Sequence, residues 1–110
     1  GFKVIYPEKM NFDLQVKYFR NARLIIGEEG AALTNLLFAS ENVKILELQE
    51  PHMISTNLFK DLAGLFQSDY VKIIGHRCLI GENGFARDGF YISVFRVIRW
   101  LLKNRIKIIS

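Results

Sequence analysis

Short runs rich in β-branched and aromatic residues alternate along this chain with runs whose apolar residues recur at helical spacing. We expect the first kind to form strands, over residues 2–6, 23–27, 43–48 and 70–75. We expect helices between and after them, over residues 11–21, 30–39, 55–66 and 93–103. Neighbouring strands joined by helical crossovers run parallel. The sequence therefore predicts an α/β fold with a mostly parallel sheet of about four strands, helices on both faces and right-handed crossovers.

Residues that favour helix starts and loops mark the ends of these elements. Asn11 can cap the first helix, Ser55 or Thr56 the third and Ser93 the last. Residues 76–89 contain three glycines and are expected to form a loop. We expect an extended segment or a helix start at residues 90–92, and the pattern of residues 106–109 allows a terminal strand.

The composition narrows the class of protein. A chain of 110 residues has the length of one domain, and 50% hydrophobic with 24% charged residues excludes intrinsic disorder. A single Cys excludes a disulfide scaffold and fits a reducing compartment. No apolar run approaches the roughly 18 residues of a membrane span. The chain begins at Gly1 rather than Met and shows no signal peptide, so we expect further residues upstream in a parent protein.

The net charge of +4 is concentrated toward the C-terminus. Five cations cluster there, at positions 96, 99, 103, 105 and 107. They are typical of the solvated face and the cation-favoured end of a helix. The alternative is a patch for nucleic acid or for an anionic membrane surface. We favour the solvated face, and we expect no nucleic-acid partner because no RNA-binding signature or zinc-ligand spacing accompanies the charge.

In parallel sheets ligands bind beyond the C-terminal ends of the strands. The segment from Gly27 to Gly30 lies at such an end, where small residues let a ligand approach and a helix start offers N–H groups to a phosphate. It is neither a Walker loop nor a GxGxxG motif. The spacing alone favours a structural turn whose acidic residues complement the helix dipole.

Isolated titratable residues at the same edge carry weaker signals. His52 and His76 lack metal-ligand spacing and are expected to be loop residues, with a phosphate contact by His76 and Arg77 as the alternative. Cys78 is expected to act as a small hydrophobe. We expect no metal site and no cofactor.

Three blocks of the sequence share a pattern that the isolated motifs do not show. They are residues 15–27, residues 30–38, which read Gly-Ala-Ala-Leu-Thr-Asn-Leu-Leu-Phe, and residues 43–48. Together they resemble the C-terminal half of family-61 glycosyltransferases, many of which are described as capsular polysaccharide biosynthesis proteins. The resemblance begins near Val4 and fades after Gly75, with weak similarity again at residues 88–92.

The resemblance implies a GT-B type enzyme, built from two Rossmann-like domains with a cleft between them. Residues 1–110 would be one Rossmann-like three-layer α/β/α domain, the C-terminal one, which holds the nucleotide-sugar donor. The residues that would line the donor diphosphate or sugar are Gly27, Gly30, Ala31, Thr34 and Asn35. Glu47 would lie near the end of the next strand, although alternation along residues 43–48 leaves a surface position as the alternative.

One position departs from the family pattern. Many members carry a His directly before the glycine that matches Gly30, whereas this chain has Glu29, preceded by Glu28. Two carboxylates would repel a diphosphate, but they could accept hydrogen bonds from sugar or ribose hydroxyls. Glu29 is therefore a donor-site candidate and the candidate base toward an acceptor hydroxyl.

The function that the resemblance implies is transfer of a sugar from a nucleotide-sugar to a glycan acceptor in polysaccharide biosynthesis. The implied partners are that donor, the acceptor and an N-terminal domain of a parent protein, in the cytoplasm or at the inner face of the membrane. We expect the 110-residue chain alone to be inactive and to form homodimers through a face left uncovered. The alternatives are a non-catalytic α/β binding module and a response-regulator-like domain. The second would need an acidic pocket at the end of the first strand and a Lys after a late strand, and the order of motifs in this chain does not supply them.

Overall fold

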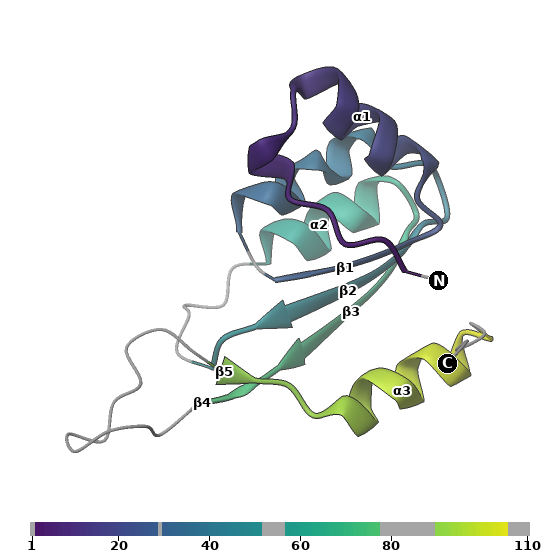
Figure 1. Cartoon of the computed structure of the whole chain (residues 1–110). Helices are drawn as coiled ribbons and strands as arrows, with labels where there is room; N and C mark the ends of the chain where they lie inside the picture. Colours follow the sequence, from purple (N-terminus) through teal and green to yellow (C-terminus); the bar gives the residue numbers. More distant parts are fainter. Residues whose placement is uncertain (1, 29, 52–56, 78–89, 106–110) are drawn as a thin grey trace, which may run out of the picture.

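A three-stranded parallel sheet forms the centre of the chain (Figure 1). The computed structural model describes residues 2–28, 30–51, 57–77 and 90–105. The sheet has the order β1-β2-β3, and its strands are β1 (Leu24–Glu28), β2 (Lys44–Gln49) and β3 (Asp69–Ile74). The helical elements are η1 (Pro7–Lys9), α1 (Phe12–Asn21), η2 (Ala31–Phe38), α2 (Leu58–Leu65) and α3 (Val94–Lys103). The predicted α/β class with a parallel sheet is confirmed.

Helices cover both faces of this sheet. Helices α1, η2 and α2 lie on one face, and α3 lies on the opposite face (Figure 1). The two connections between parallel strands contain η2 and α2, so β1 and β2 are each followed by a helical segment that returns the chain to the start of the next strand. This is the three-layer arrangement that the alternation of strand and helix runs predicts.

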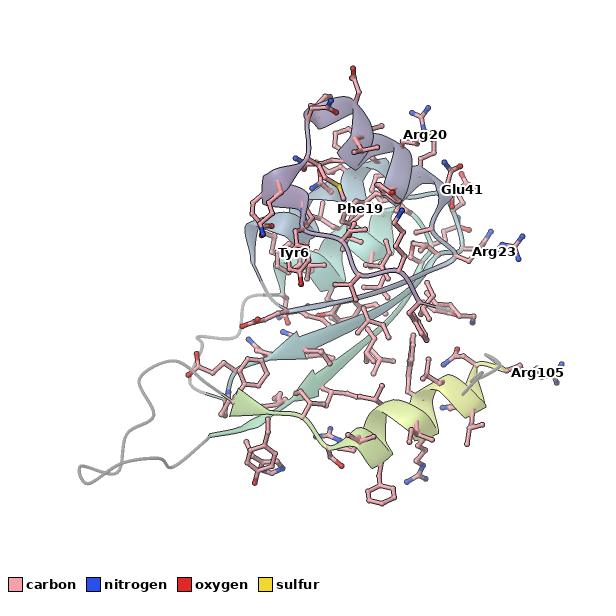
Figure 2. The ribbon with its side chains drawn as sticks, in the orientation of Figure 1. Tyr6, Phe19, Arg20, Arg23, Glu41 and Arg105 are labelled. Atoms are coloured by element: carbon pink, nitrogen blue, oxygen red, sulfur yellow. The ribbon has the colours of Figure 1, made fainter. Side chains whose placement is uncertain are left out.

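Alternation along β2 divides the apolar residues between two cores. Val43 and Ile45 face α1, η2 and α2, where they pack with Phe19, Leu36 and Phe59. Phe19 is the buried residue of α1, while Arg20 beside it points to solvent (Figure 2). The opposite face of the sheet packs against α3 through a second set of buried residues, Leu46, Ile73, Trp100 and Leu101. Both faces of the central strand are therefore buried, as expected for parallel sheets.

Residues 2–6 do not form the strand that their composition predicts, so the parallel sheet has three strands rather than four. In this segment only Ile5 packs against the core, while Phe2, Val4 and Tyr6 are exposed. Lys3 contacts α1 instead, where its Nζ donates to the hydroxyl of Tyr18 and lies 4.6 Å from the ring centroid. The segment is anchored to a helix and has no strand beside it among the described residues.

The element after β1 is a 3-10 helix, not the predicted α-helix. A 3-10 helix has three residues per turn, so side chains three apart lie in one row. Leu33, Leu36 and Ala39 have this spacing, and all three pack into the core on this face of the sheet. Leu37, which an α-helical period would align with Leu33, is half-exposed. The apolar spacing of this segment fits the tighter helix.

The remaining predictions concern the start of α2, the loop at residues 76–89, the C-terminal residues and membrane spans. Helix α2 is preceded by Asn57, and the proposed caps Ser55 and Thr56 lie outside the described residues. A two-stranded antiparallel ribbon pairs β4 (His76–Arg77), within the predicted loop, with β5 (Phe90–Tyr91). The proposed terminal strand at 106–109 also lies outside the described residues. None of the described helices is long and apolar enough to cross a membrane.

Candidate functional site

Three residues lie side by side across the sheet near the C-terminal ends of the strands. Gly27 of β1 pairs with Glu47 of β2, which pairs in turn with Lys72 of β3. This row lies on the face covered by α1, η2 and α2, because Glu47 follows Ile45 by two residues. The row brings a glycine, a carboxylate and an ammonium group to the edge of the sheet where ligands of parallel α/β proteins bind.

Glu47 is fully buried, with 0% of its surface exposed. The Tyr70 hydroxyl donates a hydrogen bond to its Oε2 atom. Lys72 Nζ lies 3.8 Å from its Oε1 atom, which accepts no hydrogen bond from the described residues. A buried carboxylate is costly unless it is paired and hydrogen-bonded. Tyr70 and Lys72 supply those partners, so the structure excludes the surface position that alternation left open for Glu47.

Gln49 extends this polar group along the same face of β2. Its side chain is buried, and its main-chain oxygen accepts a hydrogen bond of 2.8 Å from the amide of Gly75. Sequence reasoning missed Gln49, Tyr70 and Lys72. The period of two was a usable signal, because Glu47 and Gln49 continue the buried side begun by Val43 and Ile45.

Gly27 and Gly30 stand in different surroundings. A Cβ atom on Gly27 would lie 2.9 Å from Cδ2 of Leu33, so this glycine gives room to the first turn of η2. Gly30 is exposed, its φ of 166° is extended backbone, and a Cβ atom there would have no neighbour within 4 Å among the described residues. Of the two glycines, Gly30 leaves open space beside the backbone.

The start of η2 offers backbone donors next to this open space. The amide of Leu33 donates to the carbonyl of Gly30 over 3.0 Å, which is the first hydrogen bond of the helix. In a 3-10 helix the amides of Ala31 and Ala32 therefore have no acceptor within the helix. Two N–H groups with a partial positive charge at the N-terminus suit an anionic ligand.

Thr34 and Asn35 are adjacent in sequence but lie in different environments. Thr34 is exposed, whereas Asn35 is buried and its Nδ2 donates to Gln15 Oε1 over 2.8 Å. Gln15 Nε2 in turn donates to the carbonyl of Met10 over 3.0 Å. Asn35 thus ties η2 to α1, and Thr34 is the one of the pair that solvent can reach.

Three of the candidates from the sequence fall outside the part of the chain that the structure describes, and a fourth, His76, lies within it. Glu29, His52 and Cys78 lie outside the described residues. His76 is exposed, and its ring stacks on Tyr91 with centroids 5.3 Å apart. Within the described ranges, no three His, Cys, Asp or Glu residues come close enough to hold a metal ion. The candidate site therefore consists of the start of η2, the Gly27–Glu47–Lys72 row and Tyr70.

Comparison with known proteins adds one finding about the family. The family model described as Glycosyltransferase 61 matches residues 1–46. The matched range contains α1, β1, η2 and the first part of β2, and it ends directly before Glu47. No curated protein and no solved structure matches the chain. A glycosyltransferase moves a sugar from a donor to an acceptor, so the match supports glycosyl transfer. The resemblance to glycosyltransferase family 61 is thereby confirmed over residues 1–46 of this chain.

Proposed function

We propose that this chain binds the nucleotide-sugar donor of a glycosyltransferase that transfers the sugar to a glycan acceptor. The observation that carries the proposal is the family match over residues 1–46, which falls on β1, the turn after it and η2. This strand–turn–helix unit is where parallel α/β proteins receive phosphate groups. The polar row at the ends of the three strands supports the same location.

The burial of the candidate residues suggests two kinds of role. Gly30, Ala31 and Thr34 would contact the donor, because Gly30 leaves open space, Ala31 begins η2 and Thr34 is exposed. Gly27, Asn35 and Glu47 would support the residues that contact the donor without touching it themselves. The space beside Gly27 is filled by Leu33, and Asn35 and Glu47 are buried. Glu29, which directly precedes Gly30, is the proposed base toward the acceptor hydroxyl.

The wider parts of the proposal follow from the family. Residues 1–110 would form the C-terminal, donor-binding domain of a GT-B type enzyme in polysaccharide biosynthesis, such as capsule formation. The acceptor would be bound by a second Rossmann-like domain of the parent protein, so the chain alone would be inactive. A cytoplasmic location is part of this proposal, because a single Cys fits a reducing compartment.

The contact at Gly27 favours a second candidate. The space beside this glycine is filled by Leu33, so packing alone explains why the strand ends in a residue without a side chain. On this view the chain is a non-catalytic α/β binding module that keeps the fold. The two candidates differ in whether the start of η2 binds a nucleotide.

A titration of the 110-residue chain with uridine, guanosine or cytidine diphosphate, followed by NMR, tests the proposal. We expect one nucleotide to shift the amide signals from Gly27 to Asn35. Gly30→Val should lower its affinity at least about tenfold, which corresponds to roughly 1.4 kcal/mol, because the new side chain blocks the approach to the backbone. The chain should remain folded, because a Cβ atom at this position meets none of the described residues within 4 Å.

Gly64→Val in α2 is the matched control. Gly64 is also exposed and open, but it lies in another helix. This variant should bind the nucleotide as the unaltered chain does. The donor proposal fails if none of the three nucleotides shifts these amides, or if Gly30→Val binds as well as Gly64→Val.

A further inference from the structure

The surface of helix α3 is divided into three strips along its length. Trp100 and Leu101 are buried against the sheet, and Val97 packs beside them. A second strip carries Arg96, Arg99 and Lys103. A third carries exposed apolar residues, described below. Only the first strip is buried by the packing of this domain, and the side chains of the other two strips remain exposed.

The apolar outer strip is large for the surface of one short helix. Val94, Phe95 and Leu102 are 66%, 85% and 63% exposed. At 100° per residue, Val94, Phe95 and Leu102 lie within about a third of the helix circumference, and the half-buried Ile98 lies between them. Scattered exposed apolar residues are ordinary, but a contiguous patch of this kind marks an interaction surface.

The basic strip lies directly beside the apolar one. Arg96, Arg99 and Lys103 recur at i, i+3 and i+7, which places them on one side of the helix. They line a groove of about 280 Å³ against Val71 and Ile73 of β3, which is one of the two edge strands of the parallel sheet. Arg96 Nη1 donates to the carbonyl of Ile74 over 3.1 Å. None of the three cations forms an ion pair with another of the described residues.

The charged residues of the C-terminal part of the sequence have one sign. No Asp or Glu occurs after Asp88, while cations follow at positions 96, 99, 103, 105 and 107. Arg105 continues the positive charge beyond the last turn of α3, away from the strands (Figure 2). A surface of this kind attracts an anionic partner.

We propose that the outer face of α3 docks on an anionic membrane surface. Phe95, Leu102 and Val94 enter the boundary between headgroups and acyl chains, and Arg96, Arg99 and Lys103 meet the lipid phosphates. A strongly amphipathic helix with cations on its polar face and large apolar residues beside them is the form that lies in a membrane interface. Long basic side chains keep their charge at headgroup level while their stems contact apolar groups.

Two other occupants fit this face less well. A nucleic acid would satisfy the cations but leave Val94, Phe95 and Leu102 against phosphates and water. A second copy of the chain, docked through the same face in a two-fold dimer, would bring two basic strips toward each other and would be opposed by like-charge repulsion. An anionic bilayer satisfies both strips at once. This inference is independent of the donor site, because α3 lies on the opposite face of the sheet from η2 (Figure 1).

Vesicle flotation of the full 110-residue chain tests the proposal. We expect binding to phosphatidylcholine vesicles that contain phosphatidylglycerol, little binding to vesicles of phosphatidylcholine alone, and loss of binding as salt is raised. Each cation removed near an anionic surface should weaken the partition about fivefold. The double variant Arg99→Gln, Lys103→Gln should therefore bind at least about tenfold more weakly. Phe95→Ser should also bind at least about tenfold more weakly, because the apolar contact of its ring is lost.

Matched controls come from the opposite side of the molecule. Leu65→Ser removes an apolar side chain that is 76% exposed in α2, and Arg20→Gln removes an exposed cation in α1. Both controls should bind vesicles as the unaltered chain does. Far-UV circular dichroism should be the same for all four variants, because each substituted side chain is exposed.

The proposal is overturned if the chain does not bind anionic vesicles, or if the α3 variants bind as well as the controls. Light scattering supplies a further outcome. If Phe95→Ser dissociates a dimer while no form binds vesicles, the occupant is a second copy of the chain. If the chain binds duplex or single-stranded nucleic acid in a gel-shift assay but does not bind vesicles, the occupant of this face is a nucleic acid and not a membrane.

Discussion

Three glycines near the sheet differ in what surrounds the space that a side chain would occupy. At Gly30 that space is open, and at Gly27 it contains the end of the Leu33 side chain, 2.9 Å from a Cβ atom. At Gly75 a Cβ atom would lie 2.3 Å from Cδ2 of Phe90 and 2.9 Å from the main-chain oxygen of Tyr91. A side-chain end can move, but a backbone oxygen held in a strand moves much less easily. The cost of adding a methyl group should therefore follow this order.

We predict that Gly75→Ala lowers the free energy of unfolding by about 2–3 kcal/mol and Gly27→Ala by about 1 kcal/mol. Gly30→Ala should change it by less than about 0.5 kcal/mol, because it makes no contact. Urea unfolding midpoints at constant slope measure these values. An equal loss at Gly27 and Gly30 would contradict the contact with Leu33.

Glu47 shows how a buried charge depends on its partners. Its carboxylate has no exposure, and it is oriented by the Tyr70 hydroxyl at one oxygen and by Lys72 at the other. Removing a partner from a buried polar group costs more than the hydrogen bond itself, because the remaining group is left desolvated. The effects of Tyr70 and Glu47 substitutions on the free energy of unfolding should therefore be non-additive.

We predict that Tyr70→Phe lowers the free energy of unfolding by about 1–3 kcal/mol. In a Glu47→Gln background the same change should cost clearly less, because no buried charge remains to be compensated. A double-mutant cycle from denaturant unfolding gives the coupling. Additive losses would mean that the hydroxyl does not stabilise the carboxylate.

At the scale of elements, α1 and α3 have equal length, and each is preceded by a residue type that favours helix starts. Only the residue before α1 forms a side-chain capping hydrogen bond. The Asn11 side chain accepts a hydrogen bond of 2.9 Å from the amide of Leu14 at the start of α1. Ser93 stands at the same place before α3, yet its side chain makes no capping hydrogen bond. Helix α3 depends instead on its buried side chains, Trp100 and Leu101.

Asn11→Ala should accordingly destabilise the chain by about 1 kcal/mol, and Ser93→Ala by less than about 0.5 kcal/mol. Thermal unfolding followed by circular dichroism compares the two variants, each of which removes one polar side chain at a helix start. If Ser93→Ala costs as much as Asn11→Ala, the hydroxyl of Ser93 does contribute a cap.

At the scale of the whole molecule, β2 is the strand on which both cores meet. It pairs with β1 and β3, and its residues alternate between the core under α1, η2 and α2 and the core under α3. Residues 2–6 lie outside the sheet and contribute only Ile5 to a core. Opening β2 therefore requires most of the structure to unfold, whereas the N-terminal segment can detach alone.

Amide hydrogen exchange should be slowest in β2 and fast in residues 2–6. The amides of β2 are expected to exchange with the free energy of global unfolding, measured by NMR under native conditions. If residues 2–6 were protected as strongly as β2, they would form the fourth strand that the sequence predicts, and the detached segment would be contradicted.

Much of the fold could be predicted because it depends on local patterns. Runs rich in β-branched and apolar residues marked β1, β2 and β3, and helical spacing marked α1, α2 and α3, to within a few residues, while the strand–helix alternation indicated the parallel sheet. The 3-10 form of η2 was missed, because the preference of Ala and Leu for α-helix is weak against the packing of residues three apart. The start of η2 was located from the sequence, but its partners across the sheet were not.

The sequence by itself determined the strand–helix order and the family resemblance, because both reside in residues close together along the chain. Only the tertiary structure decided that residues 2–6 remain outside the sheet, that Glu47 is buried between Tyr70 and Lys72, and that the apolar strip of α3 is left uncovered. The physical reason is that pairing and burial depend on which distant segments lie opposite a residue, and a local pattern cannot specify them.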